Sequence, residues 1–156
     1  MRLRDVMKRM IGTVVTLSRF LLDTNVCIYC LDGNPKIINY LGDIIRNPHN
    51  ELILSVITEA ELFSSTKVYN NPSLKAEISS FIDSTDEVKE ITREIACTAG
   101  EIRAYFHQNL GKKIKLPDAL IAATAIHLKA TLVSNNDRDF TDALSRYETV
   151  YYNPVK

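Results

Sequence analysis

Short apolar runs alternate with segments of helical periodicity along this chain, and this alternation constrains the fold more than any other feature. The apolar runs at residues 20–22, 51–55 and 131–134 are too short for buried helices but long enough for strands. Short apolar strands separated by helices are typical of a parallel sheet that helices cover on both faces. The sequence therefore predicts an α/β fold around a mostly parallel sheet.

Turn and capping residues mark where the elements begin and end. Gly111 follows a long helical stretch and suits its C-terminal cap, whereas Pro117 suits the first turn of the next helix. Strands are expected at residues 20–22, 51–55, 131–134 and 148–152, with a weaker one near 87–89. Helices are expected at residues 26–31, 35–46, 56–63, 73–81, 92–108 and 118–129. The sheet is therefore expected to have four to five strands.

Residues 1–19 form a basic lead segment ahead of the single domain expected at residues 20–156. Five basic residues and one aspartate give this segment a net charge of +4, although the whole chain has a formal net charge of zero. Its apolar residues recur every three or four positions, as on one face of a helix. The segment is a docking helix, a frayed extension, or the product of a start that truly lies at Met7 or Met10. No apolar stretch fits a signal peptide or a membrane span, so we expect a cytoplasmic protein.

Composition limits the classes of function. The 19 basic and 19 acidic residues cancel, so the chain lacks the overall positive charge of a tight, non-specific nucleic-acid binder. Cys27 and Cys30 form a C-x-x-C motif after an expected strand, as in thiol oxidoreductases. Their apolar neighbours favour instead two thiols packed in a helix, and no second pair completes a zinc site. Three cysteines in total fit a reducing compartment.

Acidic residues stand where the expected strands end. Asp23 ends the first strand, and Glu61 lies about one turn into the helix after the second strand. Asp118 lies in the first turn of the last expected helix, while Asp137 and Asp139 follow the next strand. Because functional residues gather at the carboxyl ends of parallel strands, we expect these acids along one edge of the sheet.

A cluster of carboxylates requires compensation, because each charge raises the pKa of its neighbours. Magnesium and manganese ions take oxygen ligands from such clusters and neutralise the repulsion. Ions held in this way activate water and stabilise the leaving oxygen in phosphodiester hydrolysis. The constellation therefore predicts metal-assisted phosphodiester cleavage.

Each acid alone also has a simpler interpretation. Asp23 could cap a helix, Asp118 could favour a helix dipole, and Asp137 could be a turn residue. Glu61 is harder to explain in this way, because apolar residues such as Ile57 and Leu62 surround it in the sequence.

Four sequence blocks resemble those of PIN-domain ribonucleases of the VapC toxin type, across most of residues 20–140. The blocks are Phe-Leu-Leu-Asp-Thr-Asn-Val at 20–26, Ser-Val-Ile-Thr-Glu-Ala-Glu-Leu at 55–62, Leu-Pro-Asp-Ala-Leu-Ile-Ala-Ala-Thr-Ala at 116–125, and Leu-Val-Ser-Asn-Asn-Asp-Arg-Asp-Phe at 132–140. Four such blocks in the correct order are far more specific than any one of them.

The resemblance implies a three-layer α/β/α fold and a metal-dependent endoribonuclease that needs Mg²⁺ or Mn²⁺ and leaves 5′-phosphate and 3′-hydroxyl ends. It also implies a homodimer that a small antitoxin protein inhibits. By matching position, Asp23, Glu61 and Asp118 would be metal ligands. The lead segment has no counterpart in the typical member, which leaves its role open.

The fourth acid and the auxiliary residues are less sharply defined by the resemblance. Asp139 matches the acid before the family's phenylalanine, while Asn136 stands where some members place a ligand aspartate, and Asp137 is a third option. Ser134 replaces the usual threonine and keeps a hydroxyl. The auxiliary polar residues of the matching blocks are Asn25, Thr58, Ser134 and Asn136.

Basic residues close to the acids are candidates for RNA binding. Lys112, Lys113 and Lys115 precede Asp118, and Arg138 stands between the two candidate fourth acids. Phosphates are held by such side chains, so we expect the lysines to border the substrate groove. The competing interpretation is an ordinary solvated loop.

Two other classes of function remain open. Phosphatases with an aspartate nucleophile also begin from an aspartate after the first strand, but they place a general acid where this chain has Asn25. A non-catalytic RNA-binding or regulatory module with the same fold is the second alternative. It would retain the fold without turnover.

Overall fold

The computed structural model describes residues 16–156, so most of the lead segment predicted at residues 1–19 lies outside the described part of the chain. The strands are β1 (Ser18–Leu22), β2 (Asn50–Ser55), β3 (Glu87–Lys89), β4 (Thr131–Val133) and β5 (Tyr151–Tyr152). The helices are α2 (Thr24–Leu31), α3 (Pro35–Arg46), α4 (Val56–Phe63), α5 (Thr66–Tyr69), α6 (Pro72–Ser84), α7 (Arg93–Leu110), α8 (Leu116–Leu128) and α9 (Asp137–Leu144). Among these described helices, none combines the length and apolar character that crossing a membrane requires.

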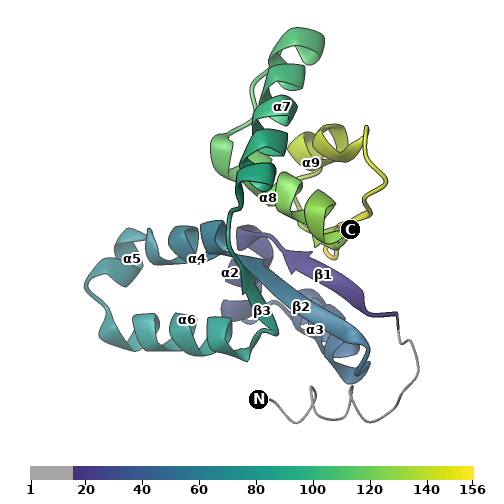
Figure 1. The fold of residues 1–156 in the computed structure, drawn as a ribbon. Coiled ribbons are helices and arrows are strands. Elements are labelled where there is room, and N and C mark those ends of the chain that lie inside the picture. The colour runs from purple at the N-terminus through teal and green to yellow at the C-terminus, as the bar shows by residue number, and fades with distance from the viewer. Residues whose placement is uncertain (1–15) are drawn as a thin grey trace.

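The five strands form one sheet in the order β3-β2-β1-β4-β5, and all neighbouring strands are parallel. Figure 1 shows β3, β2 and β1 side by side. The central strand β1 pairs Leu21 with Ile53 of β2 on one side and with Leu132 of β4 on the other. The chain builds outward from β1 through β2 and β3, then crosses over to β4 and β5. This reversal between β1 and β4 is a topological switch point, where open α/β sheets form a crevice at the carboxyl ends of the strands.

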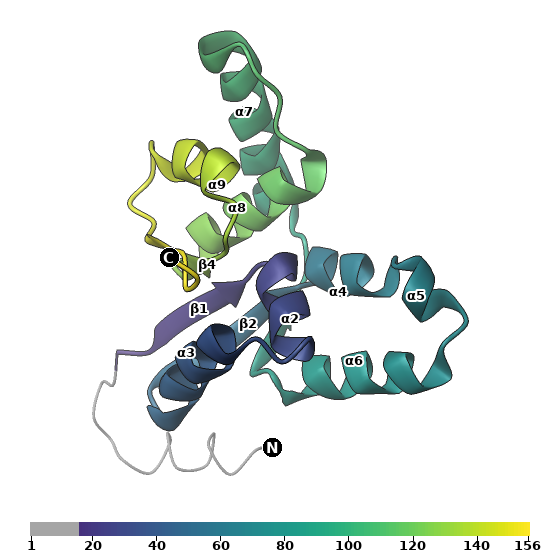
Figure 2. The same ribbon diagram turned by 180° about the vertical axis from the view of Figure 1, so that it is seen from behind.

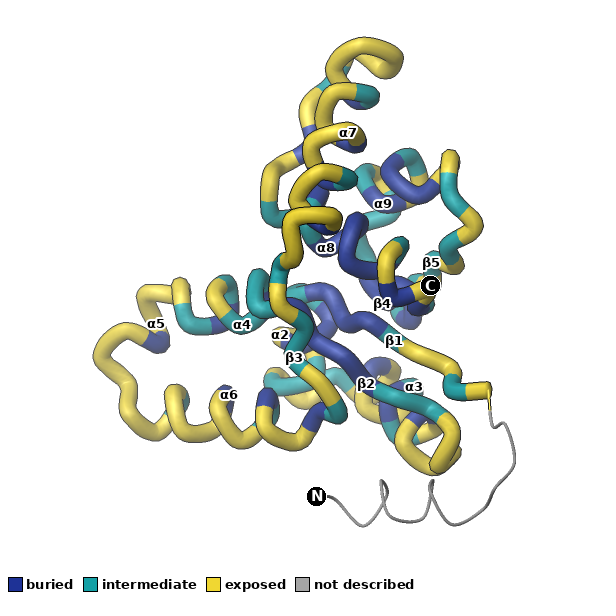
Figure 3. The backbone as a smooth tube through the Cα atoms, in the orientation of Figure 1, coloured by how far each residue is buried: buried dark blue, intermediate teal, exposed yellow. Residues whose placement is uncertain are grey.

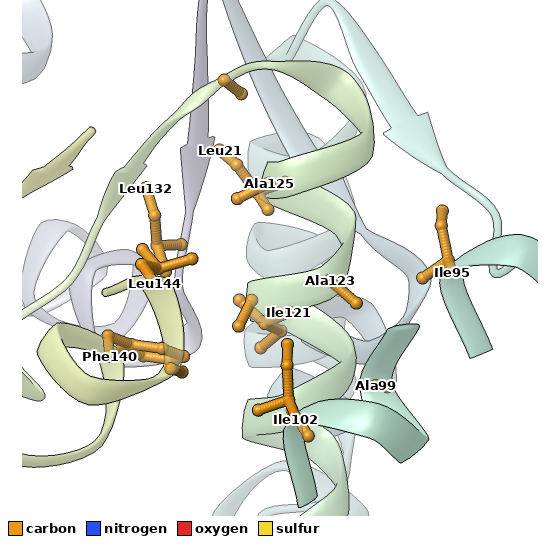
Figure 4. Packing of buried hydrophobic residues seen from close by; sticks show 14 of the residues in the cluster. Leu21, Ile95, Ala99, Ile102, Ile121, Ala123, Ala125, Leu132, Phe140 and Leu144 are labelled. Carbon is orange, nitrogen blue, oxygen red and sulfur yellow. The ribbon is translucent and has the colours of Figure 1, made fainter. Parts of the chain in front are cut away.

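Helices cover both faces of the sheet, which confirms the predicted α/β/α arrangement. Side chains alternate along the strands: Leu21 packs in the cluster with α7, α8 and α9, whereas Leu22 packs in the cluster with α2 to α6. Figure 4 shows the first cluster, in which Ile121 of α8 lies near Ile102 of α7 and Phe140 of α9. Figure 2 shows the other side of the molecule, with α2 and α3 turned towards the viewer.

Burial explains which helices are amphipathic and which are not. Nearly every residue of α8 from Ala119 to Ala125 is buried, because this helix lies between the sheet and α7 (Figure 3). In contrast, α7 buries one stripe formed by Ile95, Ala99, Ile102 and Phe106, at the spacing of a single helix face. The helix α8 therefore has a fixed position, and so does the acid in its first turn.

Local sequence signals account for most helix ends. The Asn34 side chain accepts hydrogen bonds from the amides at the start of α3, and Ser55 caps α4 in a similar way. Gly111 ends α7 in the left-handed region at φ 61°, which glycine adopts without the strain of a Cβ atom. The expected boundaries of α3 and α4 at residues 35–46 and 56–63 are confirmed.

Three elements differ most from the expected ones, and smaller differences lie at element ends, as in α6, which ends at Ser84 instead of residue 81. The last strand spans only Tyr151–Tyr152 instead of residues 148–152, because residues 145–148 form turns after α9. The short helix α5 and the helix α9 were not expected. The apolar spacing of Phe140, Ala143 and Leu144, all buried, was the available signal for α9.

Candidate active site

The candidate site lies at the switch point, where β1 and β4 end side by side. Asp23 directly follows β1, and its backbone amide donates a hydrogen bond to the carbonyl of Val133, the last residue of β4, over 3.0 Å. Ser134 follows β4 directly and is fully buried. The two strands therefore bring a carboxylate and a hydroxyl together from positions far apart in the sequence.

Asp23 is a buried carboxylate, with only 4% of its surface exposed. Burial raises its pKa from 3.8 to about 6; the hydrogen bonds from Ser134 and from the Thr24 amide oppose this rise, and the charges of Asp118 and Glu61 add to it. The Thr24 amide bond also makes Asp23 the N-cap of α2. Asp23 therefore does cap a helix, as its simpler interpretation proposed. Capping alone does not explain why this buried carboxylate, whose pKa is raised, lies close to two further acids, Asp118 and Glu61.

The Ser134 hydroxyl organises the polar side of the site. It donates to Asp23 Oδ2 over 2.7 Å and accepts from the Asn136 amide at 3.0 Å and from Asn25 Nδ2 at 3.4 Å. One donor and two acceptor positions are all that a hydroxyl offers, so its capacity is used completely. Ser134 therefore sets the orientation of the Asp23 carboxylate.

Glu61 lies on α4, whereas Asp23 lies at the start of α2. The Thr24 hydroxyl donates a short hydrogen bond to Glu61 Oε2. Since Thr24 follows Asp23 directly in the chain, this contact links the first two acids of the site through one residue. Thr58, one turn before Glu61 on α4, has a buried hydroxyl without a hydrogen-bond partner among the described residues.

Asp118 lies in the first turn of α8 and is partly buried. Burial raises its pKa, the charges of Asp139 and Glu61 raise it further, and the positive charge of Lys115 lowers it. Asp118 therefore interacts electrostatically with Asp139 of α9 and with Glu61 of α4. The same charge also acts on Asp23, so the four carboxylates form one electrostatic group.

Asp139 and Asp137 lie two positions apart at the start of α9, which places them on nearly opposite faces of that helix, about 200° apart. Asp139 accepts a hydrogen bond from Asn136 Nδ2 at 3.2 Å, and its charge reaches Asp118. Asn136 itself supports Asp139 in this arrangement.

Asp137 takes part in a separate network with the C-terminal segment. Its carboxylate pairs with Lys156 and accepts hydrogen bonds from the Tyr151 hydroxyl at 2.6 Å and from the Asn153 amide at 2.9 Å. These contacts, with Lys156 the largest contributor, lower the pKa of Asp137 to about 2. The two candidates for the fourth acid therefore have different surroundings: Asp139 lies near Asp118, whereas Asp137 contacts the C-terminal segment. The sequence alone did not distinguish them.

The carboxylates surround a common region but do not converge on one point. Within residues 16–156, no three histidine, cysteine or acidic side chains stand close enough to coordinate one ion as they are placed. Like charges repel, and three of the four acids are each held by a neighbouring donor: Asp23 by Ser134, Glu61 by Thr24 and Asp139 by Asn136. The buried Oδ1 atom of Asn25 has no partner among the described residues either, so an oxygen acceptor is left unused beside this group.

The predicted RNA-binding side chains have different surroundings. Lys112 forms an ion pair with Asp142 of α9 and lies over the ring of Phe106. Lys113, Lys115 and Arg138 are exposed. The lysine triplet is therefore not one uniform patch, because its first member is already engaged within the protein.

The cysteines form no second site in the described part of the chain. All three thiols are free, with Cys27 buried in α2 and Cys97 exposed on α7. Burial raises the pKa of the Cys27 thiol well above its usual value, which keeps the thiol protonated and unreactive.

Comparisons with known proteins agree with the fold and with the order of the blocks. The PIN domain family matches residues 20–143. Among curated proteins, the ribonuclease VapC2 of Rickettsia felis is 32% identical over 123 residues, which cover 78% of this chain and 89% of that protein.

Solved structures give the same match in three dimensions. The structure of VapBC2 from Rickettsia felis bound to a DNA fragment from their promoter matches with a TM-score of 0.69 at 27% identity, covering 86% of this chain and 98% of the other. The structure of VapBC-1 from nontypeable Haemophilus influenzae matches with a TM-score of 0.72 at 25% identity, covering 88% of this chain and 99% of the other. The described fold is therefore shared over almost the whole length of these relatives.

Proposed function

The chain belongs to the PIN-domain family of VapC ribonucleases, and we propose that it is a divalent-metal-dependent endoribonuclease whose catalytic carboxylates are Asp23, Glu61, Asp118 and Asp139. The observation that carries this proposal is the electrostatic coupling of the four acids. The charges of Asp118 and Glu61 raise the pKa of Asp23, and those of Asp139 and Glu61 raise the pKa of Asp118. A protein that keeps four acids in mutual repulsion at a switch point loses stability unless a cation compensates for them.

The donor set of the site fits Mg²⁺ or Mn²⁺. All four side chains are carboxylates, and their hard oxygen atoms are the ligands that Mg²⁺ and Mn²⁺ prefer. When bound, the metal would supply an activated water and would stabilise charge on the leaving oxygen. Three residues orient the ligands: Ser134 holds Asp23, Thr24 holds Glu61, and Asn136 holds Asp139.

Asn25 and Thr58 have auxiliary roles in this proposal. The unused buried Oδ1 atom of Asn25 lies on a side chain that already donates to Ser134, so it is available to orient a water molecule near Asp23. The Thr58 hydroxyl is the second buried polar atom without a partner in the described chain. Buried polar atoms usually find a partner, so both are suited to solvent or metal-bound water.

The protein is further proposed to be the toxin of a toxin-antitoxin pair and to act as a homodimer. Support comes from the solved relatives, which are VapBC assemblies. The chain also exposes large apolar side chains on α2 and α3, with Ile28 at 45%, Ile38 at 46% and Ile45 at 54% exposure. Such side chains suit a protein interface.

One experiment tests the proposed activity directly. Purified protein is incubated with structured RNA and with DNA of the same sequence, with Mg²⁺, with Mn²⁺, or with a chelator. We expect cleavage of RNA only when metal is present, with 5′-phosphate and 3′-hydroxyl ends on the products. Binding of RNA without cleavage under any metal condition would instead support the non-catalytic module.

A further inference from the structure

A basic hollow lies between the C-terminal half of α7 and the loop that leads to α8. It has a volume of about 260 Å³ and is lined by Arg103, His107, Lys113 and Ile114. Arg103 and His107 stand four residues apart on α7, which puts them on the same helix face. Sequence reasoning identified only Lys113 of this set, because helix α7 is separated from the catalytic blocks in the chain.

The backbone around the hollow is held in place by three local features. Gly111 ends α7 in a left-handed conformation, so the chain turns back along the helix. Ile114 is buried at 3% exposure and anchors the loop against the core. The Arg103 Nε atom donates a hydrogen bond to the Ile114 carbonyl at 3.4 Å, which joins the helix to the loop across the hollow.

The hollow is lined by the basic side chains of Arg103 and Lys113. No acidic residue of the described chain lines it, and the one lysine of the loop that forms an ion pair, Lys112, is directed to Asp142 instead. Among the described residues, Lys113 has no ion pair within 4.0 Å. The terminal guanidinium nitrogens of Arg103, the Lys113 ammonium group and the His107 ring therefore offer several hydrogen-bond donors to an anion.

We propose that this hollow binds a backbone phosphate of the RNA substrate, outside the carboxylate cluster. The proposal rests on the proposed ribonuclease function. Lys113 precedes Asp118 by five residues, so the two backbones are at most about 18 Å apart. The phosphate bound in the hollow therefore belongs to a nucleotide a few positions from the bond that is cut.

The chemistry of the lining favours a phosphate over a base. A base would require an aromatic platform on which to stack, and within residues 16–156 no aromatic ring other than the imidazole of His107 lines the hollow. Guanidinium and ammonium groups recognise phosphate oxygens through charge-assisted hydrogen bonds. The hollow therefore contributes affinity and strand position without reading sequence.

The test uses the full chain with the substitutions Arg103→Gln and Lys113→Gln, separately and together. Binding of a single-stranded RNA is measured by fluorescence anisotropy in a chelator, where no cleavage occurs, at several salt concentrations. We expect the double variant to bind about tenfold more weakly at low salt. The slope of log affinity against log salt concentration should become shallower by about 1.4, because each of the two cations that bind phosphate accounts for about 0.7. In cleavage assays with metal, KM should rise while kcat stays within about twofold.

Matched variants control for general charge and for folding. Arg93→Gln removes an exposed arginine from the other end of the same helix, and Lys75→Gln removes an exposed lysine from α6. Both should bind RNA as the wild type does. Lys113→Gln alone changes neither partner of the bond from Arg103 to the Ile114 carbonyl, so this variant tests the lysine charge with that contact between helix and loop retained.

The outcomes separate this inference from the proposed function. If the wild type cleaves RNA but the double variant keeps the same affinity, salt dependence and KM, the hollow is not a phosphate site. A lower kcat with unchanged KM would also overturn it, because that pattern belongs to the reacting groups. If no RNA is cleaved by the wild type, the proposed function fails, while the binding measurement still decides whether the hollow holds RNA.

Discussion

The Ser134 hydroxyl donates a 2.7 Å hydrogen bond to the carboxylate of Asp23, and this bond joins the ends of the two strands that flank the switch point. The bond is buried, and it lowers the pKa of Asp23 while burial raises it. Ser134 therefore favours the charged form of Asp23, which is the form that binds a cation.

Replacing Ser134 by alanine should weaken metal binding. The substitution removes the only side-chain hydroxyl that donates to Asp23 among the described residues, so the protonated form of Asp23 becomes more favourable. We expect affinity for Mn²⁺ to fall by about 10-fold to 100-fold, as for other groups that orient metal ligands. Isothermal titration with Mn²⁺ measures this change.

Ser134→Thr is the matched control, because threonine retains the hydroxyl and is the usual residue at this position in the PIN-domain family. It should bind Mn²⁺ with nearly the affinity of the wild type. Equal weakening by alanine and by threonine would mean that packing around residue 134, and not the hydroxyl, determines the affinity.

The pair Asp139→Asn and Asp137→Asn tests the choice of the fourth acid. Asp139→Asn should reduce RNA cleavage by more than about 100-fold, because it removes a proposed metal ligand. Asp137→Asn should leave kcat almost unchanged and lower the melting temperature, because it breaks the ion pair with Lys156. Cleavage rates and melting temperatures of both variants are measured in the same buffer.

The reverse pattern would exchange the roles of these two acids. Loss of cleavage in Asp137→Asn at an unchanged melting temperature would show that the contacts with Tyr151 and Asn153 serve catalysis. An Asp139→Asn variant with full activity would show that Asp139, and with it α9, contributes no ligand to the proposed site.

Asp23→Asn should change how the stability of the metal-free protein depends on pH. The raised pKa of Asp23 means that the folded state holds a proton that the unfolded state releases, so its stabilising contribution is complete below pH 4 and is lost as the pH rises to about 6. Relative to the wild type, the variant should therefore gain up to about 3 kcal/mol of unfolding free energy between pH 4 and pH 7.

Urea denaturation in a chelator at a series of pH values measures this difference. Asp32→Asn, which changes an exposed acid at the end of α2, is the control and should not alter the pH dependence. If the stability difference between Asp23→Asn and the wild type is the same at pH 4 and pH 7, burial does not raise the pKa of Asp23 as the structure indicates.

Much of the fold was predictable because buried strands and capped helices leave strong local signals. Apolar runs at residues 20–22 and 51–55 predicted β1 and β2 closely, and the helix expected at residues 35–46 matches α3. The parallel arrangement followed from helices between the strands, and pairing of all five strands confirms it.

The remaining features depend on contacts between distant segments. The last strand is shorter than expected because residues 145–148 form turns after α9, and the apolar Val150 lies outside β5 with 63% of its surface exposed. The separation of Asp137 from Asp139 required the helix α9 and the position of the C-terminal segment, including Lys156. Composition and spacing do not specify which of two nearby acids meets the end of the chain.

The same limitation applies to the basic residues. Adjacency to Asp118 suggested one lysine triplet, but the ion pair between Lys112 and Asp142 depends on packing of α9 against α8. Arg103 gains a role only because α7 and the following loop run side by side. Both relationships arise from tertiary structure.

The measurement that tests the central claim most directly is the rate of RNA cleavage as a function of Mg²⁺ concentration, for the wild type and for Asp118→Asn under single-turnover conditions. We expect a rate that saturates with Mg²⁺ in the wild type and is at least about 1,000-fold lower in the variant at every concentration, because Asp118 is the proposed ligand that couples to both α4 and α9. Cleavage by the wild type that persists in a chelator, or an Asp118→Asn variant as active as the wild type, would contradict the account.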